Sequence, residues 1–264
     1  MMDMDKEIVE SIVQDCIKSG YTSLNLSHRN LVVLPSNVSK IENLEYLLLN
    51  SCKISMPPSE LSSLVHLKEL ILDENNLTML PSCLRDINSL QCLCVSRNPL
   101  TFISSDISNL QNLTRFFMDE TEVMFLPAEI GNLNNLEYFS AASCNLRNLP
   151  QEIGHLSKLR WLRLCRNDIS SLPETISKLK MLYFLDLNRN SLEGVCSEIT
   201  ELVSLRTLLL QHNKISKIEE QLCSFLCCLS KLDLRNNDIT DMPVDLMSSD
   251  TLWIGPSEVP GVFS

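Results

Sequence analysis

A leucine recurs every 23 residues along most of this chain. The recurring positions are Leu44, Leu67, Leu90, Leu113, Leu136, Leu159, Leu182 and Leu205, with Tyr21 one period earlier. A tenth copy begins at Leu229, one residue late, so the unit before it holds 24 residues. Self-similarity at a short fixed period is the signature of a solenoid, in which each unit packs only against its neighbours.

Each unit follows the pattern L-x-x-L-x-L-x-x-N-x-L-x-x-L-P-x-x-I-x-x-L-x-x, which is plainest in residues 159–181. Its first six positions alternate apolar and polar residues as a strand does, and equivalent strands of successive units can pair in parallel. The apolar spacing after the proline fits a short helical or 3₁₀ turn. The sequence therefore predicts an α/β solenoid, a horseshoe of about ten coils, with a parallel sheet on its concave face and short helical or 3₁₀ turns on its convex face.

The ninth position of each unit requires a polar side chain, because the backbone turns into the stack there and unpaired buried amides cost about 1–3 kcal/mol each. Asparagine fills this position six times, at Asn75, Asn98, Asn167, Asn190, Asn213 and Asn237. Arg29, Cys52, Thr121 and Cys144 replace it in the other units. We expect these four coils to be less regular than the rest.

The two ends of the array need different structure, since a terminal coil would otherwise expose its leucines. Residues 1–20 carry an apolar stripe at helical spacing that ends at Gly20, which predicts an amphipathic capping helix; its acidic polar face disfavours a membrane anchor. Residues 21–251 form the predicted repeat domain. Residues 252–264 are interpreted as a C-terminal tail that begins with an aborted unit.

Composition and charge restrict the function. A formal net charge of -11 argues against general affinity for nucleic acid or anionic membranes. Eleven cysteines without framework spacing, and a start that resembles no signal peptide, favour a reducing cytoplasmic setting. The residue spacing indicates no metal site, cofactor-binding loop or catalytic set, so we expect neither cofactor nor enzymatic activity.

The L-P-x-x-I-x-x-L signature makes residues 21–251 resemble the intracellular leucine-rich-repeat proteins with 23-residue units. Within that family, the units are similar to those of the Ras-pathway scaffold and Ras-suppressor group. The resemblance implies a cytoplasmic adaptor that binds a protein such as a small GTPase, a phosphatase or another adaptor. Similar units also occur in plant immune receptors, ciliary proteins and bacterial effectors, so the subgroup is an analogy at the level of fold.

An aromatic ladder marks the candidate binding site. If positions one, four and six of each unit point inward, position three faces the concave side, and there Tyr138, Trp161 and Phe184 follow one another on adjacent strands about 5 Å apart. The predicted partner-binding residues around the ladder are Tyr183, Arg160, Arg163, Arg166 and Arg189. Large aromatic side chains beside arginines are typical of interface hot spots.

Two interpretations of this patch remain open. Concave positions carry excess acid in the first five units and excess base in the last five, which favours a partner with an acidic segment. Alternatively, the aromatic residues stabilise the sheet and the arginines pair with Glu137 and Asp186.

The sequence as a whole predicts a monomeric, non-catalytic protein-binding module in intracellular signalling or assembly. The alternatives are a pattern-sensing or receptor-type ligand-binding domain, and the repeat fragment of a larger regulatory protein.

Overall fold

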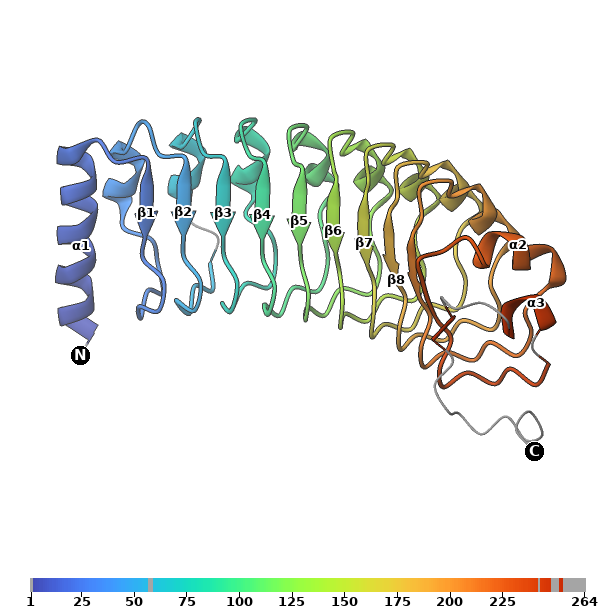
Figure 1. Ribbon diagram of the computed structural model, residues 1–264. Helices are drawn as coiled ribbons and strands as arrows, with labels where there is room; N and C mark the ends of the chain where they lie inside the picture. The colour runs from blue at the N-terminus through green and yellow to red at the C-terminus, as the bar shows by residue number, and fades with distance from the viewer. Residues whose placement is uncertain (1, 57–58, 242, 248–251, 254–264) are drawn as a thin grey trace.

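The protein is an open solenoid whose coils stack in chain order (Figure 1). A computed structural model describes residues 2–56, 59–241, 243–247 and 252–253. The first coils stack almost straight, and the later ones curve (Figure 1). The predicted α/β solenoid, with a parallel sheet on one face and 3₁₀ turns on the other, is confirmed.

One parallel sheet of 11 strands runs the length of the stack in sequential order. Its strands are β1 (Ser23–Asn25), β2 (Tyr46–Leu48), β3 (Glu69–Ile71), β4 (Cys92–Cys94), β5 (Arg115–Phe117), β6 (Tyr138–Ser140), β7 (Trp161–Arg163), β8 (Phe184–Asp186), β9 (Thr207–Leu209), β10 (Lys231–Asp233) and β11 (Leu252–Trp253). Equivalent positions of neighbouring units pair, as Leu24 does with Leu47. The longer ninth unit does not disturb this register, because Thr207 still pairs with Lys231.

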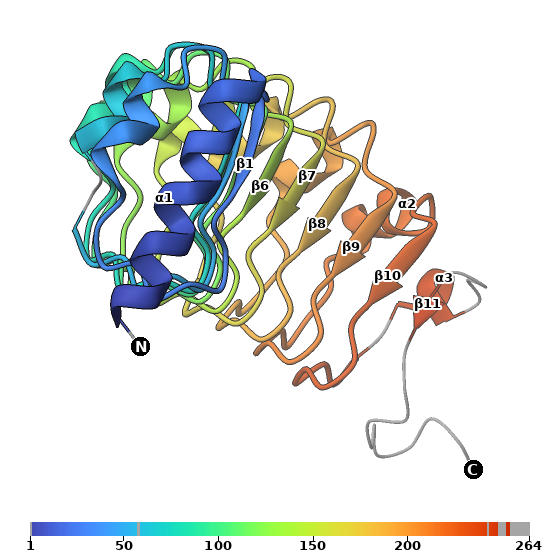
Figure 2. The same cartoon turned by 90° about the vertical axis from the view of Figure 1, so that its left-hand side faces the viewer.

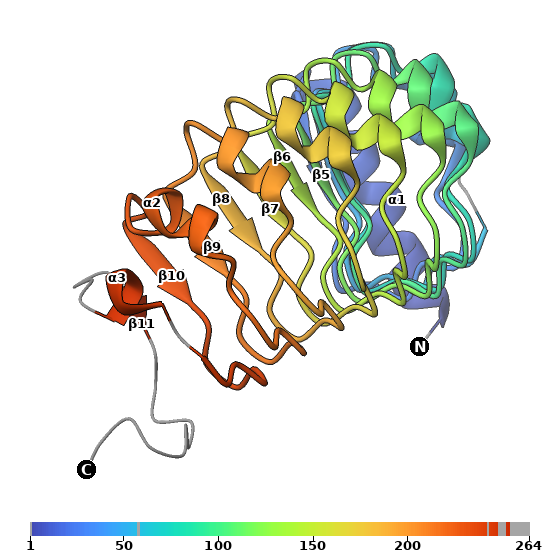
Figure 3. The same cartoon turned by 90° about the vertical axis from the view of Figure 1, so that its right-hand side faces the viewer.

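The opposite face carries one short helical turn in each coil. These turns are η1 (Ser36–Lys40), η2 (Ser59–Ser63), η3 (Ser82–Asp86), η4 (Ser105–Asn109), η5 (Ala128–Asn132), η6 (Gln151–His155), η7 (Glu174–Lys178), η8 (Ser197–Glu201) and η9 (Glu220–Leu222). Two α-helical turns, α2 (Cys223–Leu226) and α3 (Val244–Met247), follow near the C-terminal end (Figure 3). The extra residue of the ninth unit lies where η9 continues directly into α2.

The core is a continuous column of leucines, because the inward positions of every coil meet those of the next. Its N-terminal end is covered by α1 (Met2–Ser19), which lies across the first coil (Figure 2). Val9, Val13 and Cys16 of this helix are buried in the same core. Gly20 follows with a φ of 65°, a left-handed conformation that ends the helix. Most of the tail, residues 254–264, lies outside the described residues.

The asparagines at the ninth position connect neighbouring coils. Asn75 accepts hydrogen bonds from the backbone N–H groups of Cys52 (3.2 Å) and Ile54 (2.9 Å) of the preceding coil. Its amide also donates to the carbonyls of Leu49 (2.8 Å) and Leu72 (2.9 Å). One buried side chain thus satisfies backbone groups in two coils, as the unit pattern requires.

The four coils without asparagine differ from one another. In the second coil Lys53 adopts a φ of 65°, an additional left-handed residue. In the first coil the buried Nε of Arg29 has no hydrogen-bond partner among the described residues. The coils of Thr121 and Cys144 keep the ordinary backbone, with a φ of 55° at Glu120 and 54° at Ser143, so no such irregularity appears there.

Candidate functional site

The predicted aromatic ladder exists on the concave sheet. Tyr138 of β6 pairs in register with Trp161 of β7, and Trp161 pairs with Phe184 of β8. The Trp161 and Phe184 rings stack with centroids 5.2 Å apart and an angle of 13° between their planes. Because the two residues occupy the same position of adjacent coils, the register of the sheet itself fixes this stack.

Exposed apolar surface continues from the ladder toward the loops that precede the strands. Tyr138, Tyr183 and Met181 are exposed, whereas Trp161 and Phe184 are half-buried. An open hollow of about 410 Å³ is lined by Tyr138, Trp161, Met181 and Tyr183, together with Arg160 and Ser204. We call Tyr138, Trp161, Met181, Tyr183 and Phe184 the aromatic platform.

Two of the predicted arginines are committed to carboxylates of the sheet. The Nη1 of Arg163 lies 3.0 Å from Oδ2 of Asp119, two coils away, and its Nε lies 3.9 Å from Oδ2 of Asp186. The Nε of Arg160 lies 3.6 Å from Oε2 of Glu137. The alternative interpretation therefore holds for these two side chains, which neutralise acids on the concave face.

Arg166 and Arg189 differ from that pair. Both are exposed, and within the described residues neither has a carboxylate oxygen within 4.0 Å. They occupy the eighth position of adjacent coils, with φ values of 58° and 55°. Backbone bonds to the following coil support this left-handed conformation, since the Arg166 N–H donates to the Asn188 carbonyl at 2.8 Å. Both guanidinium groups are therefore free to contact a partner.

Burial alters the titration of groups under the patch. It raises the pKa of the Asp186 carboxyl, although that carboxylate accepts the Asn188 N–H and lies near Arg163. Burial also raises the pKa of the Cys165 thiol to about 11, which keeps the thiol protonated at neutral pH. The protonated Cys165 thiol is therefore not poised for nucleophilic attack.

Charged side chains elsewhere on the concave face also form ion pairs. Arg97 bridges Glu74 and Glu120, and Arg115 reaches Glu69 at 3.0 Å. Glu69, Glu74 and Glu120 of the first coils are thus paired within the concave face. The Cys92 and Cys94 sulfurs are 3.9 Å apart and form no disulfide. In the part of the chain that the structure describes, no group of three histidine, cysteine, aspartate or glutamate residues could hold a metal ion.

Met181 and Ser204 complete the hollow, and neither is among the predicted site residues. They lie in the loops that precede β8 and β9, so a search of the strand columns alone passes over them. A methionine next to an inward leucine, at a position where the other units carry polar residues more often, was the available signal. No helix in the described ranges is both long and apolar enough to cross a membrane.

Comparison with solved structures places this fold beside repeat proteins of diverse origin. A leucine-rich-repeat protein of Leptospira interrogans aligns with a TM-score of 0.72 and 25% identity over 90% of this chain and 73% of its own. The ectodomain of the Arabidopsis thaliana receptor kinase GASSHO1/SCHENGEN3, solved with CASPARIAN STRIP INTEGRITY FACTOR 2, aligns with a TM-score of 0.75 and 28% identity over 87% of this chain. PEPR1, solved with AtPEP1, aligns with a TM-score of 0.68 and 25% identity over 84% of this chain.

The chain spans 29% of the GASSHO1/SCHENGEN3 chain and 36% of the PEPR1 chain. No curated protein matches this sequence. The family model described as the leucine-rich repeat region matches residues 23–160 and 143–246, which together cover most of the coils described above. On this match and on its fold, the chain belongs to the leucine-rich repeat family.

Proposed function

We propose that this protein is a non-catalytic adaptor that binds a protein partner on its concave face, at the aromatic platform and the two free arginines. The observation that carries the proposal is the coincidence of exposed aromatic surface over β6–β8 with Arg166 and Arg189, which have no acidic partner among the described residues. Tyrosine, tryptophan and arginine are the residues most enriched in binding hot spots.

The rigidity of the platform supports this function. Ring stacking between Trp161 and Phe184 and the ion pairs of Arg163 hold the surface in place before any partner arrives. A preorganised surface loses little conformational entropy on binding. The two free guanidinium groups lie further along the same coils, so the partner segment is expected to present apolar or aromatic side chains to the platform and carboxylates to Arg166 and Arg189.

The resemblance to Ras-pathway scaffolds makes a small GTPase, a phosphatase or another adaptor the proposed class of partner. A cytoplasmic location and a monomeric state belong to the same proposal. The eleven cysteines, none of which forms a disulfide, fit a reducing compartment, because many of them act as buried apolar residues in the coils.

The test combines Trp161→Ala with Arg189→Ala. Arg163 is unsuitable for substitution, because its loss would leave Asp119 and the buried Asp186 without their counter-charge. Tyr46→Ala is the matched control, since Tyr46 is an exposed aromatic residue at the same strand position in the second coil.

We expect proximity labelling in cells to recover the same set of proteins with wild type and with Tyr46→Ala. The double variant should lose that set. A purified protein from that set should bind the double variant at least about tenfold more weakly, a loss of about 1.4 kcal/mol. Unfolding curves of the three proteins confirm that each is folded. An unchanged set of neighbours, or equal loss with Tyr46→Ala, would disprove the proposal.

A receptor-type domain that binds a peptide is the second candidate. It is favoured by two of these neighbours, the receptor kinase ectodomain of GASSHO1/SCHENGEN3 solved in complex with CASPARIAN STRIP INTEGRITY FACTOR 2 and PEPR1 solved with AtPEP1. Mass spectrometry after alkylation of the native protein under non-reducing conditions separates the two candidates. Disulfide-bonded cysteines would support the receptor-type domain, and free thiols would support the adaptor.

A further inference from the structure

A second exposed surface lies on the side of the solenoid, away from the concave sheet. The thirteenth position of the first five coils is apolar in every case: Val33, Met56, Met79, Phe102 and Phe125. These side chains are between 46% and 70% exposed, in the loops between the strands and the 3₁₀ turns. The same position of the last five coils holds Asn148, Ser171, Gly194, Lys217 and Asp241. We call the five apolar side chains the lateral ridge.

The flanks of the lateral ridge are also uncharged. The twelfth position of the first five coils holds valine, serine, threonine, threonine and methionine, and the sixteenth holds four serines and an alanine. Charged residues enter these two columns only from the sixth coil onward, beginning with Arg147. No packing requirement explains the change, because the exposed residues of both halves lie outside a core that is leucine-rich throughout. An exposed apolar strip of this length indicates an interaction surface.

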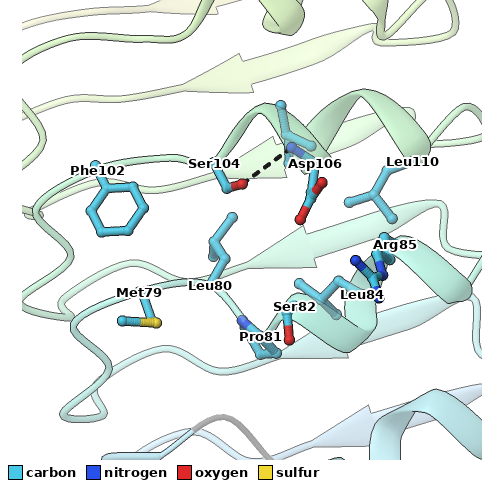
Figure 4. Close-up of a pocket in the computed structure, with 11 residues that line it drawn as sticks. Met79, Leu80, Pro81, Ser82, Leu84, Arg85, Phe102, Ser104, Asp106 and Leu110 are labelled. Carbon is cyan, nitrogen blue, oxygen red and sulfur yellow. Dashed lines mark hydrogen bonds between the residues drawn. The ribbon is translucent and has the colours of Figure 1, made fainter.

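A hollow of about 180 Å³ opens beside the centre of the ridge, between the third and fourth coils (Figure 4). Met79 and Phe102 lie at one end, and the buried side chains of Leu84, Ile107 and Leu110 line it. In the fourth coil Ser104 replaces the usual proline, and its Oγ accepts the Asp106 N–H at 3.2 Å. The hollow is of a size to receive one large apolar side chain from a partner.

Acidic residues border the end of the ridge at Phe102 and Phe125. Glu122 is exposed on one side of it, and Asp106 and Glu129, in the first turns of η4 and η5, are half-buried on the other. Across the described ranges no basic nitrogen lies within 4.0 Å of these three carboxylates. The apolar strip therefore ends among three carboxylates without an ion-pair partner in the described ranges and one exposed arginine, Arg147 of the sixth coil, so the local charge is net negative.

We propose that the lateral ridge binds an amphipathic helix of another protein, one whose apolar stripe is flanked by lysine or arginine at one end. Coils of a parallel stack repeat about every 4.8 Å, close to the roughly 5.4 Å pitch of a helix, so side chains at i, i+4, i+7 and i+11 can follow successive coils. A ridge one residue wide with small flanking residues suits the width of a single helix. The acids around Phe125 select basic flanks.

Two other occupants fit less well. An anionic membrane surface would be repelled by the bordering acids and by the net charge of -11. A second copy of this chain would bring the same acids of both copies toward the interface, since a twofold contact is self-complementary. Both remain as outcomes of the test.

The experiment uses a displayed library of 18-residue helical peptides, panned on the immobilised full chain. We expect the enriched peptides to share apolar residues at i, i+4 and i+7 with lysine or arginine near one end of that stripe. Fluorescence anisotropy should show at least tenfold weaker binding to Phe102→Glu, and weaker, less salt-dependent binding to Glu122→Lys. The matched control is Ser171→Glu, which places the same charge at the same position of the seventh coil and should leave affinity unchanged.

Phe102 is exposed, so its substitution should leave the unfolding curve unchanged, and that curve is measured in parallel. Three results would overturn the proposal. These are enriched peptides without the stripe, peptides equally sensitive to Ser171→Glu or insensitive to Phe102→Glu, and a wild-type dimer in light scattering that Phe102→Glu dissociates. The last would assign the ridge to a second copy. A fourth result, binding of wild type but not of Phe102→Glu to vesicles of phosphatidylcholine and phosphatidylserine without any peptide, would also overturn it and would assign the ridge to an anionic membrane.

Discussion

Replacing Asn167 by alanine should destabilise the solenoid by about 2–4 kcal/mol. Asn167 is only 7% exposed. Its Oδ1 accepts the Leu146 N–H at 3.1 Å, and its Nδ2 donates to the Ala141 carbonyl at 2.7 Å and the Leu164 carbonyl at 2.9 Å. The Leu164 carbonyl keeps a second donor, the Asn190 amide. Truncation therefore leaves the Leu146 N–H and the Ala141 carbonyl buried without this hydrogen-bond partner. The loss costs about 1–3 kcal/mol for the N–H and less for the carbonyl.

The protein itself suggests an intermediate variant. At the equivalent position of the preceding coil, the Cys144 thiol lies 3.3 Å from the Met118 carbonyl, where an asparagine would place its amide. Asn167→Cys should therefore keep one donated hydrogen bond and lose the accepted one, with a loss between those of alanine and wild type. Asn148→Ala is the control, because Asn148 is exposed and its substitution should cost less than about 0.5 kcal/mol.

Equilibrium urea unfolding followed by circular dichroism measures the free energy of unfolding of all four proteins. An unchanged m-value is required for the comparison, because coils that unfold separately would lower it. If Asn167→Ala lost no more than Asn148→Ala, backbone satisfaction by the ninth position would not be a source of stability. Equal losses for alanine and cysteine would refute the role of the donated bond, the one interaction that cysteine is expected to keep.

Two further predictions concern packing and titration. Gly154→Ala should destabilise the protein by about 1–3 kcal/mol in the same assay, because an added Cβ would lie 2.7 Å from the Thr175 Cβ of the next coil; Gly194→Ala, where nothing lies within 4 Å, should not, and equal effects would contradict this. Burial raises the pKa of Asp186 above its ordinary value of 3.8, so the folded state disfavours the ionised carboxyl. This cost is absent below pH about 3.8, where the carboxyl is protonated in both folded and unfolded states, and it grows as pH rises through the raised pKa. Asp186→Asn should therefore gain stability relative to wild type between pH 3 and pH 7, and a constant difference across that range would contradict the prediction.

The fold could be predicted from the sequence because one period determines both strand pairing and core. Every inward leucine at the fourth position meets its equivalent in the next coil, as Leu24 meets Leu47, so alignment of the units is alignment of the strands. The aromatic ladder followed from the same rule. The direction of each side chain depends on its position in the unit, and that position can be assigned from the repeat pattern.

The ion pairs could not be predicted from the repeat pattern in the same way. Arg163 reaches Asp119 across two coils, and this contact depends on side-chain length and on which carboxylates the sheet leaves accessible. The left-handed eighth position also has no signature, since histidine, serine, glutamate, arginine and asparagine all occupy it and glycine never does. Hydrogen bonds to the following coil support it there, such as that from the Arg166 N–H to the Asn188 carbonyl. A conformation held by neighbours leaves little trace in local residue choice.

The lateral ridge, in contrast, is visible in the sequence as a run of apolar residues at the thirteenth position, which the repeat pattern leaves variable. Its five apolar residues belong to coils one to five, whereas the aromatic platform belongs to coils six to eight and faces the concave side. Because each coil packs mainly on its neighbours, surface changes at Phe102 and at Trp161 should act independently. A chain that bound a single partner would need only one of these surfaces. Two surfaces of different chemistry on separate parts of one rigid array are what an adaptor needs to hold two proteins at a fixed separation, and the array supplies that separation at about 5 Å per coil.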